Sequence, residues 1–350
     1  MLLTNRLEST NADPEPEDLL SSSLSVIFPD TVANQHGDAS NALEYVSPHL
    51  PRRLRIELAD PPDDQDRLLF GHYLWNASLL AAELVERGTL AGDASADELD
   101  GAGEGELSAP RRTFDIRGKS VVELGAGTAL PSTMAALLGA AEVVVTDYPS
   151  PTLLATLRAN VARNISRENS PEGYVPEKVE VLGHSWGEID GLDQRKGAFD
   201  IVIAADCLVS YSFSHQPYAP ASPFHKQGAL RRRQLSYAAN SPTPESQHTH
   251  THADRDPQWM PWQHQNLLAS TAHLLKRSPT ARAWIIAGFH TGRRNMRGFF
   301  DPASLRAAGL VAEYLWEVDC MGVERAWAWE REGEDVRRWC SVGVLKWIDP

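Results

Sequence analysis

Cysteine is scarce in this sequence: there are three among 350 residues, and no two of them form a CxxC pair. The odd number and wide spacing of Cys207, Cys320 and Cys340 favour neither a disulfide framework nor a zinc site. Such usage is typical of a reducing compartment. We therefore expect the cytoplasm, with the nucleus as an open alternative, and we expect no metal centre.

Long apolar runs and basic charge are also lacking. No run approaches the roughly 18 residues that a membrane span requires, and the amino terminus has no secretory h-region. The net charge is -14, and nucleic-acid phosphates are bound by concentrated Lys and Arg. We expect neither a membrane nor a nucleic acid as a partner. A basic protein partner stays open, although much of the acid lies in segments such as 93–106 and, on the simpler interpretation, only solvates them.

What the chain does contain is a long stretch of alternating strand and helix patterns from about Ser120 onward. Residues 1–66 carry Pro, Asp, Glu and Ser clusters and predict an extended N-terminal arm. A helix is predicted from Gly71, with Gly88 as its stop. Residues 67–350 are interpreted as one catalytic domain.

Short apolar runs alternate with amphipathic stretches in this domain. The predicted strands are 120–124, 142–146, 179–183, 200–204 and 283–287, and the predicted helices are 131–138, 151–164 and 263–276. Such alternation implies parallel strands joined by right-handed crossovers. Two last strand patterns, 312–318 and 339–347, predict an antiparallel pair. The predicted fold class is α/β, a Rossmann-like doubly wound sheet, mostly parallel with an antiparallel C-terminal edge.

A glycine-rich turn, Gly125-Ala126-Gly127, follows the first of these strands and precedes a helix. There a ligand can approach the backbone and the helix amides closely. A tight structural turn is the alternative. Asp147 ends the next strand, where an acidic side chain meets ribose hydroxyls in nucleotide-binding sheets, although it could equally cap the following helix. Leu130 stands where a dinucleotide would want a third glycine, so S-adenosylmethionine, which has no pyrophosphate, is the favoured cofactor.

Five motifs in order resemble the lysine methyltransferase-like proteins, a group that includes fungal protein N-terminal and lysine methyltransferases. The motifs are GHYLWNA (71–77), VVELGAGTALPS (121–132), VVVTDYPSP (143–151), HSWG (184–187) and AADCL (204–208). The resemblance covers the chain from about Leu69 to the end. It implies a class I methyltransferase fold that uses S-adenosylmethionine and acts on a protein lysine or N-terminal amine. Elongation factor 1-alpha is one substrate that it suggests.

The same resemblance implies roles for individual residues. Trp75 would help close over the cofactor, Asp147 would bind the ribose and Trp186 would lie beside the adenine. The turn would be formed by Gly125, Ala126 and Gly127, and Ala205 would contribute at the end of the fourth strand. As the alternative, both tryptophans are ordinary core anchors.

Asp206 is the candidate catalytic residue, because ligands of open α/β sheets gather at the carboxyl ends of the strands. It would orient the acceptor amine or help accept its proton. The alternative is that its carboxylate binds backbone amides of its own turn. His290 resembles a polar loop near the substrate, and Arg293 with Arg294 is predicted as a solvated pair.

Other functions and features stay open. A small-molecule N-methyltransferase with a nicotinamide-like acceptor is the second hypothesis, and a catalytically silent cofactor-binding protein is the third. Trp327 and Trp329 favour strand packing over a substrate rim. HTHTH (248–252) suggests a disordered tract rather than a metal site. The oligomeric state is not predicted.

Residues 209–258 predict a poorly ordered insertion outside the catalytic core, because long structureless loops are uncommon within domains. Two origins are open. An intron translated in frame fits the boundaries, since Val-Ser can be encoded by a donor-like sequence and Gln by an acceptor-like one. The other is a functional substrate loop.

Overall fold

The computed structural model describes residues 3–10, 34–37, 41–60, 73–90, 109–208, 261–289, 292–331 and 338–350. The chain divides into two units, and every described residue lies in the first, which comprises 1–209 and 261–350. The predicted insertion 209–258, the HTHTH tract and His290 lie outside the described residues.

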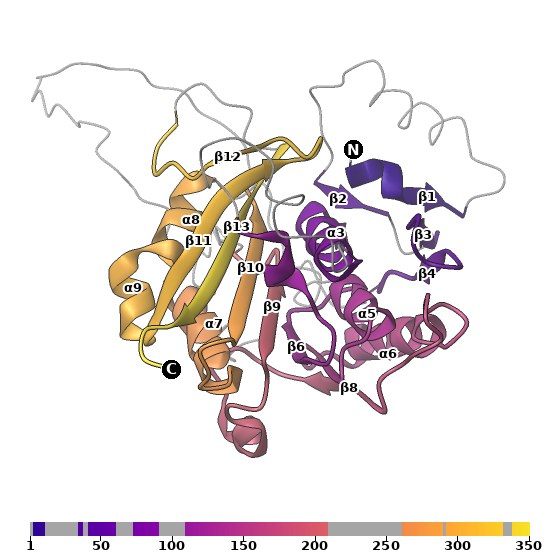
Figure 1. Cartoon of the computed structure of the whole chain (residues 1–350), viewed down its shortest axis with the longest axis horizontal. Helices are drawn as coiled ribbons and strands as arrows, with labels where there is room; N and C mark the ends of the chain where they lie inside the picture. The colour runs from indigo at the N-terminus through magenta and orange to yellow at the C-terminus, as the bar shows by residue number, and fades with distance from the viewer. Residues whose placement is uncertain are drawn as a thin grey trace, which may run out of the picture. The chain divides into compact units, whose positions relative to one another are not determined.

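An eight-stranded sheet organises the described part of the chain, in the order β12-β11-β13-β10-β9-β6-β7-β8 (Figure 1). Its strands are β6 (Ser120–Leu124), β7 (Glu142–Asp147), β8 (Lys178–Gly183), β9 (Ile201–Ala205), β10 (Arg282–Gly288), β11 (Leu310–Asp319), β12 (Glu324–Ala326) and β13 (Trp339–Trp347). The pairs from β8 to β10 are parallel, and those that involve β11, β12 and β13 are antiparallel. The predicted doubly wound sheet with an antiparallel edge is confirmed.

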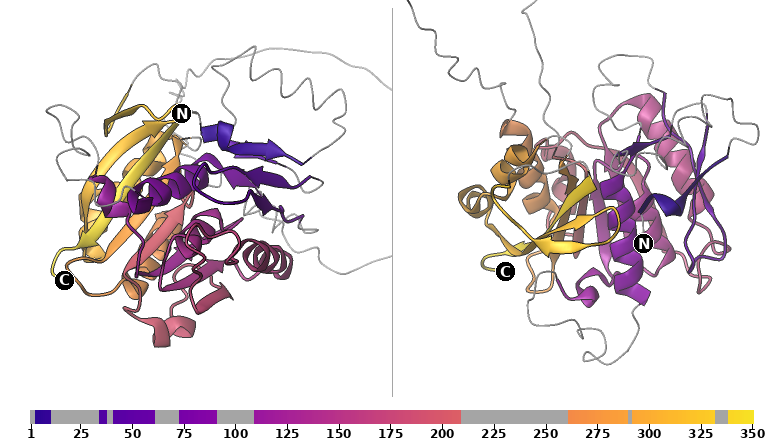
Figure 2. Two further views of the ribbon diagram at one scale, coloured as in Figure 1. Left: turned by 45° about the vertical axis from the view of Figure 1, so that its right-hand side comes forward. Right: turned by 90° about the horizontal axis from the view of Figure 1, so that it is seen from above.

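Helices cover both faces of this sheet (Figures 1 and 2). They are α3 (Asn76–Leu90), α5 (Leu130–Leu137) and α6 (Pro151–Asn164) on one face, and α7 (Pro261–Leu274), α8 (Arg293–Phe300) and α9 (Pro302–Ala307) on the other. Successive strand residues point to opposite faces, so Val121 joins the core under α3 and α5 while Val122 joins the core under α7. Apolar strands buried on both faces explain the continuous runs in the sequence.

The described parts of the predicted N-terminal arm, 1–66, form strands. β1 (Leu7–Ser9), β3 (Leu43–Tyr45) and β4 (Leu54–Ile56) make a small antiparallel sheet, and β2 (Gln35–His36) pairs with β5 (Leu74–Trp75). Arg6, the last residue of the 3-10 helix η1 (Leu3–Arg6) that precedes β1, forms a buried ion pair with Glu86 of α3, with 3.1 Å between Nη1 and Oε2.

The structure corrects the sequence prediction at three places. Leu74–Trp75 is a strand, and α3 passes Gly88 and ends at Leu90. Gly88 is a packing residue rather than a helix stop, because a Cβ there would lie 2.6 Å from the Phe114 Cβ. The final strand β13 lies between β10 and β11. The antiparallel edge of the sheet is the short strand β12, which pairs with β11 and was not predicted from the sequence.

Two short 3-10 helices complete the elements used below, η2 (Arg111–Phe114) and η3 (Asp190–Arg195). Among the described residues, no helix is both long enough and apolar enough to cross a membrane.

Candidate functional site

The glycine turn joins β6 to α5 at the carboxyl edge of the sheet. Gly125 and Gly127 have φ of 65° and 54°, the left-handed region that glycine enters without strain. A Cβ on Gly125 would lie 2.7 Å from the Cys207 Sγ and 2.9 Å from the Trp186 Cζ2. Glycine is therefore required here by neighbouring side chains as well as by backbone conformation.

Asp147 closes this turn from the neighbouring strand. Its Oδ2 accepts a hydrogen bond from the Gly127 amide at 2.6 Å, and its Oδ1 accepts one from the Tyr148 amide at 2.6 Å. The Ala126 amide donates to the Thr146 carbonyl at 3.0 Å. The structure thus brings Asp147 against the predicted turn. The N-cap of α6 is Ser150, so the alternative that Asp147 caps this helix is wrong.

The Asp147 carboxyl remains suited to binding hydroxyl donors. Burial raises its pKa to about 6, while the backbone N–H groups of Gly127 and Tyr148 act in the opposite direction. The group is therefore largely ionised at pH 7. Each carboxylate oxygen accepts one amide and keeps further lone-pair capacity, which two vicinal hydroxyls can use.

Trp186 is held beside the glycine turn by a residue that sequence reasoning missed. The buried Ser270 hydroxyl on α7 accepts from the Gly187 amide at 2.9 Å and bonds the His184 Nε2 at 2.9 Å. These bonds fix the chain on both sides of Trp186. The indole also packs against the core under α7, so the structure is compatible with both interpretations of this residue, core anchor and cofactor neighbour.

Asp206 lies immediately after β9, whose last residue is the buried Ala205. Its φ is 59°, an uncommon conformation for a non-glycine residue that is often found at functional sites. Its Oδ1 accepts from the Gly288 amide at 3.0 Å, at the end of the neighbouring strand β10. The carboxylate bonds the end of the next strand, and it lies at the same sheet edge as Asp147.

Trp75 lies on a different element, β5, opposite Gln35 of β2. Its half-buried ring meets Tyr73 edge to face, with 6.1 Å between the ring centroids. The next residue, Asn76, begins α3 and bonds the His36 Nε2 through its Oδ1 at 2.7 Å. A role for Trp75 in closing over a cofactor stays a prediction.

Two further predictions concern the region after β10. Arg293 was predicted to be solvated, but its side chain is 9% exposed and binds both oxygens of Glu317, which is fully buried. This guanidinium also stacks on Phe289 at 4.3 Å. Trp327 packs on the same Phe289 ring, while Trp329 is 43% exposed. Both residues follow β12 rather than lying in a strand, so the strand-packing prediction is correct only in that Trp327 is packed.

Glu123, the residue before Leu124 in the turn motif, is a buried carboxyl that sequence reasoning did not single out. It is fully buried, and its Oε2 accepts from the Ser132 amide in the first turn of α5 at 3.0 Å. Burial raises its pKa to about 8, and Asp147 adds to the effect. Glu123 therefore carries a proton at pH 7.

The raised pKa predicts a pH dependence of stability. From about pH 4.5 to pH 8 the folded chain keeps a proton on Glu123 that the unfolded chain has released, so the free energy of unfolding falls as pH rises through this window. Glu123→Gln mimics the protonated group and should remove this loss. Denaturation by urea at pH 4.5 and pH 8.5 measures it. The variant should gain stability over the native protein only at the higher pH, while the exposed Glu172→Gln should show no such gain.

A site of this composition fits an adenosine-bearing cofactor. The glycine turn admits no side chain at Gly125, and an ionised carboxylate with spare acceptor capacity stands beside it. Asp206 lies at the same edge, where the reacting end of a ligand would face a substrate. Among the described residues, no group of three or more His, Cys, Asp or Glu side chains is arranged to hold a metal ion.

The fold, a Rossmann-like doubly wound sheet with antiparallel strands at one end, is the class I methyltransferase fold. Residues 63–215 match the model of the lysine methyltransferase family, and the resemblance predicted from the sequence motifs is thereby confirmed.

Several similar proteins carry the name protein N-terminal and lysine N-methyltransferase EFM7. The one from Gibberella zeae is 33% identical over 151 residues, which cover 40% of this chain and 47% of that protein. The one from Cryptococcus neoformans var. neoformans is 31% identical over 207 residues, which cover 58% and 54%. The chain spans about half the length of the curated relatives it matches.

Solved structures that resemble the chain include a putative RNA methyltransferase from Pyrococcus horikoshii, with 15% identity, a TM-score of 0.41 and coverage of 84% of this chain and 93% of that one. A putative SAM-dependent methyltransferase from Streptococcus mutans has 10% identity, a TM-score of 0.43 and coverage of 94% and 65%.

Proposed function

We propose that this chain is an S-adenosylmethionine-dependent N-methyltransferase that modifies a lysine or an N-terminal amine of a protein. The observation that carries the proposal is the contact between the Asp147 carboxylate and the Gly127 amide, at the sheet edge where Asp206 also lies. The names of the relatives support a protein acceptor, and a translation factor such as elongation factor 1-alpha is the acceptor that we propose to test first.

Different residues of the site would bind different parts of the cofactor. The Asp147 carboxylate would accept hydrogen bonds from the ribose hydroxyls, and the turn at Gly125 to Gly127 would allow the methionine end to approach the backbone. Trp186, held through Ser270, would lie beside the adenine. When bound, S-adenosylmethionine supplies a methyl group on a positively charged sulfur.

Methyl transfer to an amine needs an uncharged nitrogen held in line, and little covalent help from the protein. Asp206 would hydrogen-bond the amine, orient its lone pair and help accept its proton. Its left-handed backbone and its bond to the Gly288 amide hold the carboxylate at the end of β9. Asp206 would thus both position the amine and help to accept its proton.

A small-molecule acceptor is the second candidate function. The test incubates the purified protein with cofactor labelled in its methyl group and a cell lysate, and then separates proteins from small molecules. Label in a protein band supports the proposal. Label confined to the small-molecule fraction contradicts it, and no label in either fraction favours a protein that binds the cofactor without turnover.

The segment 209–258 is proposed to be dispensable for this activity. Its deletion joins Leu208, which is 1% exposed behind β9, to Trp259, two residues before α7, and restores a short strand-to-helix connection. We expect the shortened protein to keep cofactor affinity and methyl transfer within about twofold, as measured by calorimetric titration and label incorporation. Transcript sequencing accompanies this test. If mature transcripts all retain the segment, and its deletion abolishes transfer while thermal unfolding is unchanged, the loop is functional.

A further inference from the structure

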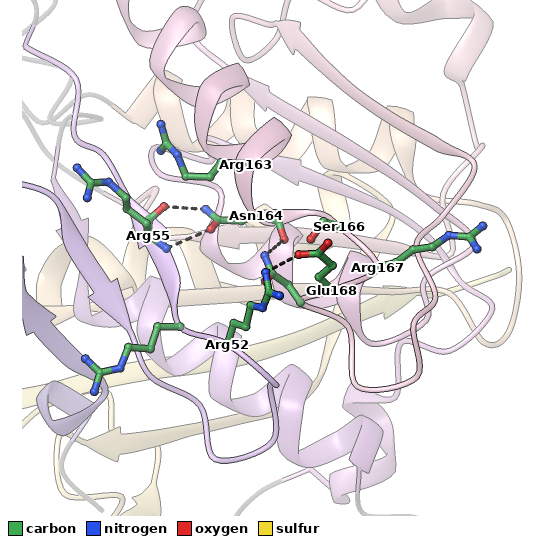
Figure 3. A pocket seen from close by; sticks show the side chains of 9 residues that line it. Arg52, Arg55, Arg163, Asn164, Ser166, Arg167 and Glu168 are labelled. Atoms are coloured by element: carbon green, nitrogen blue, oxygen red, sulfur yellow. Dashed lines mark hydrogen bonds and ion pairs between the residues drawn. The ribbon is translucent and has the colours of Figure 1, made fainter.

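A hollow in the described part of the molecule is lined by arginines. It has a volume of about 590 Å³ and lies between the segment 52–55, which leads into β4, and the end of α6 with the turn after it (Figure 3). Its lining residues are polar or charged throughout: Arg52, Arg53, Arg55, Arg163, Asn164, Ser166, Arg167, Glu168 and Asn169. Five of these nine lining residues are arginines, in a chain whose net charge is -14.

The walls of this arginine pocket are tied together by buried amide side chains. The Asn164 Oδ1 accepts from the Arg55 amide at 3.1 Å, and its Nδ2 donates to the Arg55 carbonyl at 2.8 Å, as Figure 3 shows. Asn160 makes the same pair of bonds to Glu57, at 2.9 Å and 2.8 Å. Both asparagines are buried. They satisfy the free backbone edge of β4 and hold its arginines against α6, so the pocket is built in advance of any ligand.

Carboxylates of the chain already pair with most of these arginines. Arg52 pairs with Glu168, and Arg163 pairs with Glu57 at 2.9 Å between Nη2 and Oε1. The paired side chains are at least 36% exposed, and exposed ion pairs contribute only about 0–1 kcal/mol each, so an incoming anion can replace them. Within the described ranges, no carboxylate lies within pairing distance of the exposed Arg167.

Support of the α6 carboxyl end is the simplest structural explanation of these arginines. It covers Arg163 and Arg167, which lie at or just after the helix end. This explanation does not apply to Arg52, Arg53 and Arg55, which come from a segment more than 100 residues earlier in the sequence. Arg52, Arg53 and Arg55 pair with glutamates of the chain, but such largely exposed pairs contribute only about 0–1 kcal/mol each, so pairing alone is a weak reason for gathering two separate segments around one polar hollow.

We propose that the arginine pocket binds an acidic segment of a partner polypeptide. Guanidinium groups can bind carboxylates in a bidentate geometry. The ion pairs that Arg52 and Arg163 make with glutamates of the chain show that arginines of this pocket bind carboxylates. A nucleic-acid backbone extends beyond a single hollow, and next to this one it would meet the glutamates that pair with Arg53 and Arg163, namely Glu8, Glu44 and Glu57. A short acidic peptide places its charge inside the pocket alone.

The arginine pocket is separate from the cofactor site. α6 begins four residues after Asp147, and its 14 residues span about 21 Å, so its carboxyl end lies far from the glycine turn. Binding of an acidic segment therefore does not require the cofactor. The proposal can be tested whether or not the chain proves to be a methyltransferase.

The test uses fluorescence anisotropy with the full chain and a fluorescein-labelled hexaglutamate peptide at about 50 mM salt, where charge contacts are weakly screened. The double variant Arg163→Gln/Arg167→Gln is compared with Arg111→Gln/Arg112→Gln, which removes two exposed arginines of η2. We expect saturable peptide binding by the native chain, weakened about tenfold in the first double variant and unchanged within about twofold in the second.

Three results would overturn the proposal. The first is that the peptide does not bind the native chain. The second is that the affinity for the peptide falls equally in both double variants. The third is that a labelled six-nucleotide RNA binds the native chain more tightly than the peptide does. Thermal unfolding of both double variants shows that each is folded. If the arginines only support α6, Arg163→Gln/Arg167→Gln lowers the melting temperature, and no arginine-dependent peptide binding is seen.

Discussion

Asp147→Ala should weaken S-adenosylmethionine binding by about 10- to 150-fold. The substitution removes a charge-assisted acceptor, and hydrogen bonds to charged groups contribute about 1.5–3 kcal/mol. The carboxylate already bonds the Gly127 amide, so its loss also frees the turn on which the cofactor would rest. Calorimetric titration measures the affinity directly. The exposed Asp193→Ala, whose side chain is 71% exposed, is the matched control and should bind as the native protein does.

The pKa of Asp147 gives this prediction a second readout. Because that pKa is about 6, lowering the pH through 6 protonates the group and removes the charged acceptor, so native affinity should fall there. Asp147→Ala should lack this part of the pH dependence. Unchanged affinity in a folded Asp147→Ala variant would reject the ribose contact.

Asp206→Asn should lower turnover by about 100-fold while cofactor affinity changes by less than about threefold, since only the reacting complex uses the proton-accepting oxygen. Asparagine keeps an oxygen that can accept from the Gly288 amide, and it tolerates the left-handed backbone at φ 59°. The fold should therefore survive. Single-turnover kinetics at saturating cofactor separate the chemical step from binding.

Two outcomes would change the role of Asp206. Equal turnover in the variant and the native protein removes the carboxylate from the mechanism and leaves it as a brace between β9 and β10. Parallel losses in cofactor affinity and turnover place it in the cofactor site instead. A melting temperature close to that of the native protein is required before either conclusion is drawn.

Local signals predicted the centre of the sheet well. β6 at 120–124, α6 at 151–164 and β13 at 339–347 match the predicted bounds, because apolar runs mark buried strands and Pro151 stands at the first turn of its helix. The juxtaposition of Asp147 with the glycine turn also followed from strand order, since adjacent parallel strands end at one edge.

Features that depend on partners distant in sequence were missed. Arg293 reads as a surface residue until Glu317, 24 positions later, is brought beside it. Glu123 reads as an ordinary acid of the turn motif, and only the packing of α5 over β6 buries it. The position of β13 between β10 and β11 was also missed, because the apolar pattern of a strand does not determine which strands it pairs with.

The central claim, methyl transfer to a protein amine from a cofactor held by Asp147, is tested most directly by mapping the methylated atom. A protein labelled by the native chain is digested, and the modified residue is located by mass spectrometry, with Asp147→Ala and Asp193→Ala in parallel. The account predicts the methyl group on a lysine or N-terminal nitrogen, formed by the native chain and Asp193→Ala and strongly reduced in Asp147→Ala. A methyl group on another kind of atom, or one formed equally well by a folded Asp147→Ala protein, would contradict it.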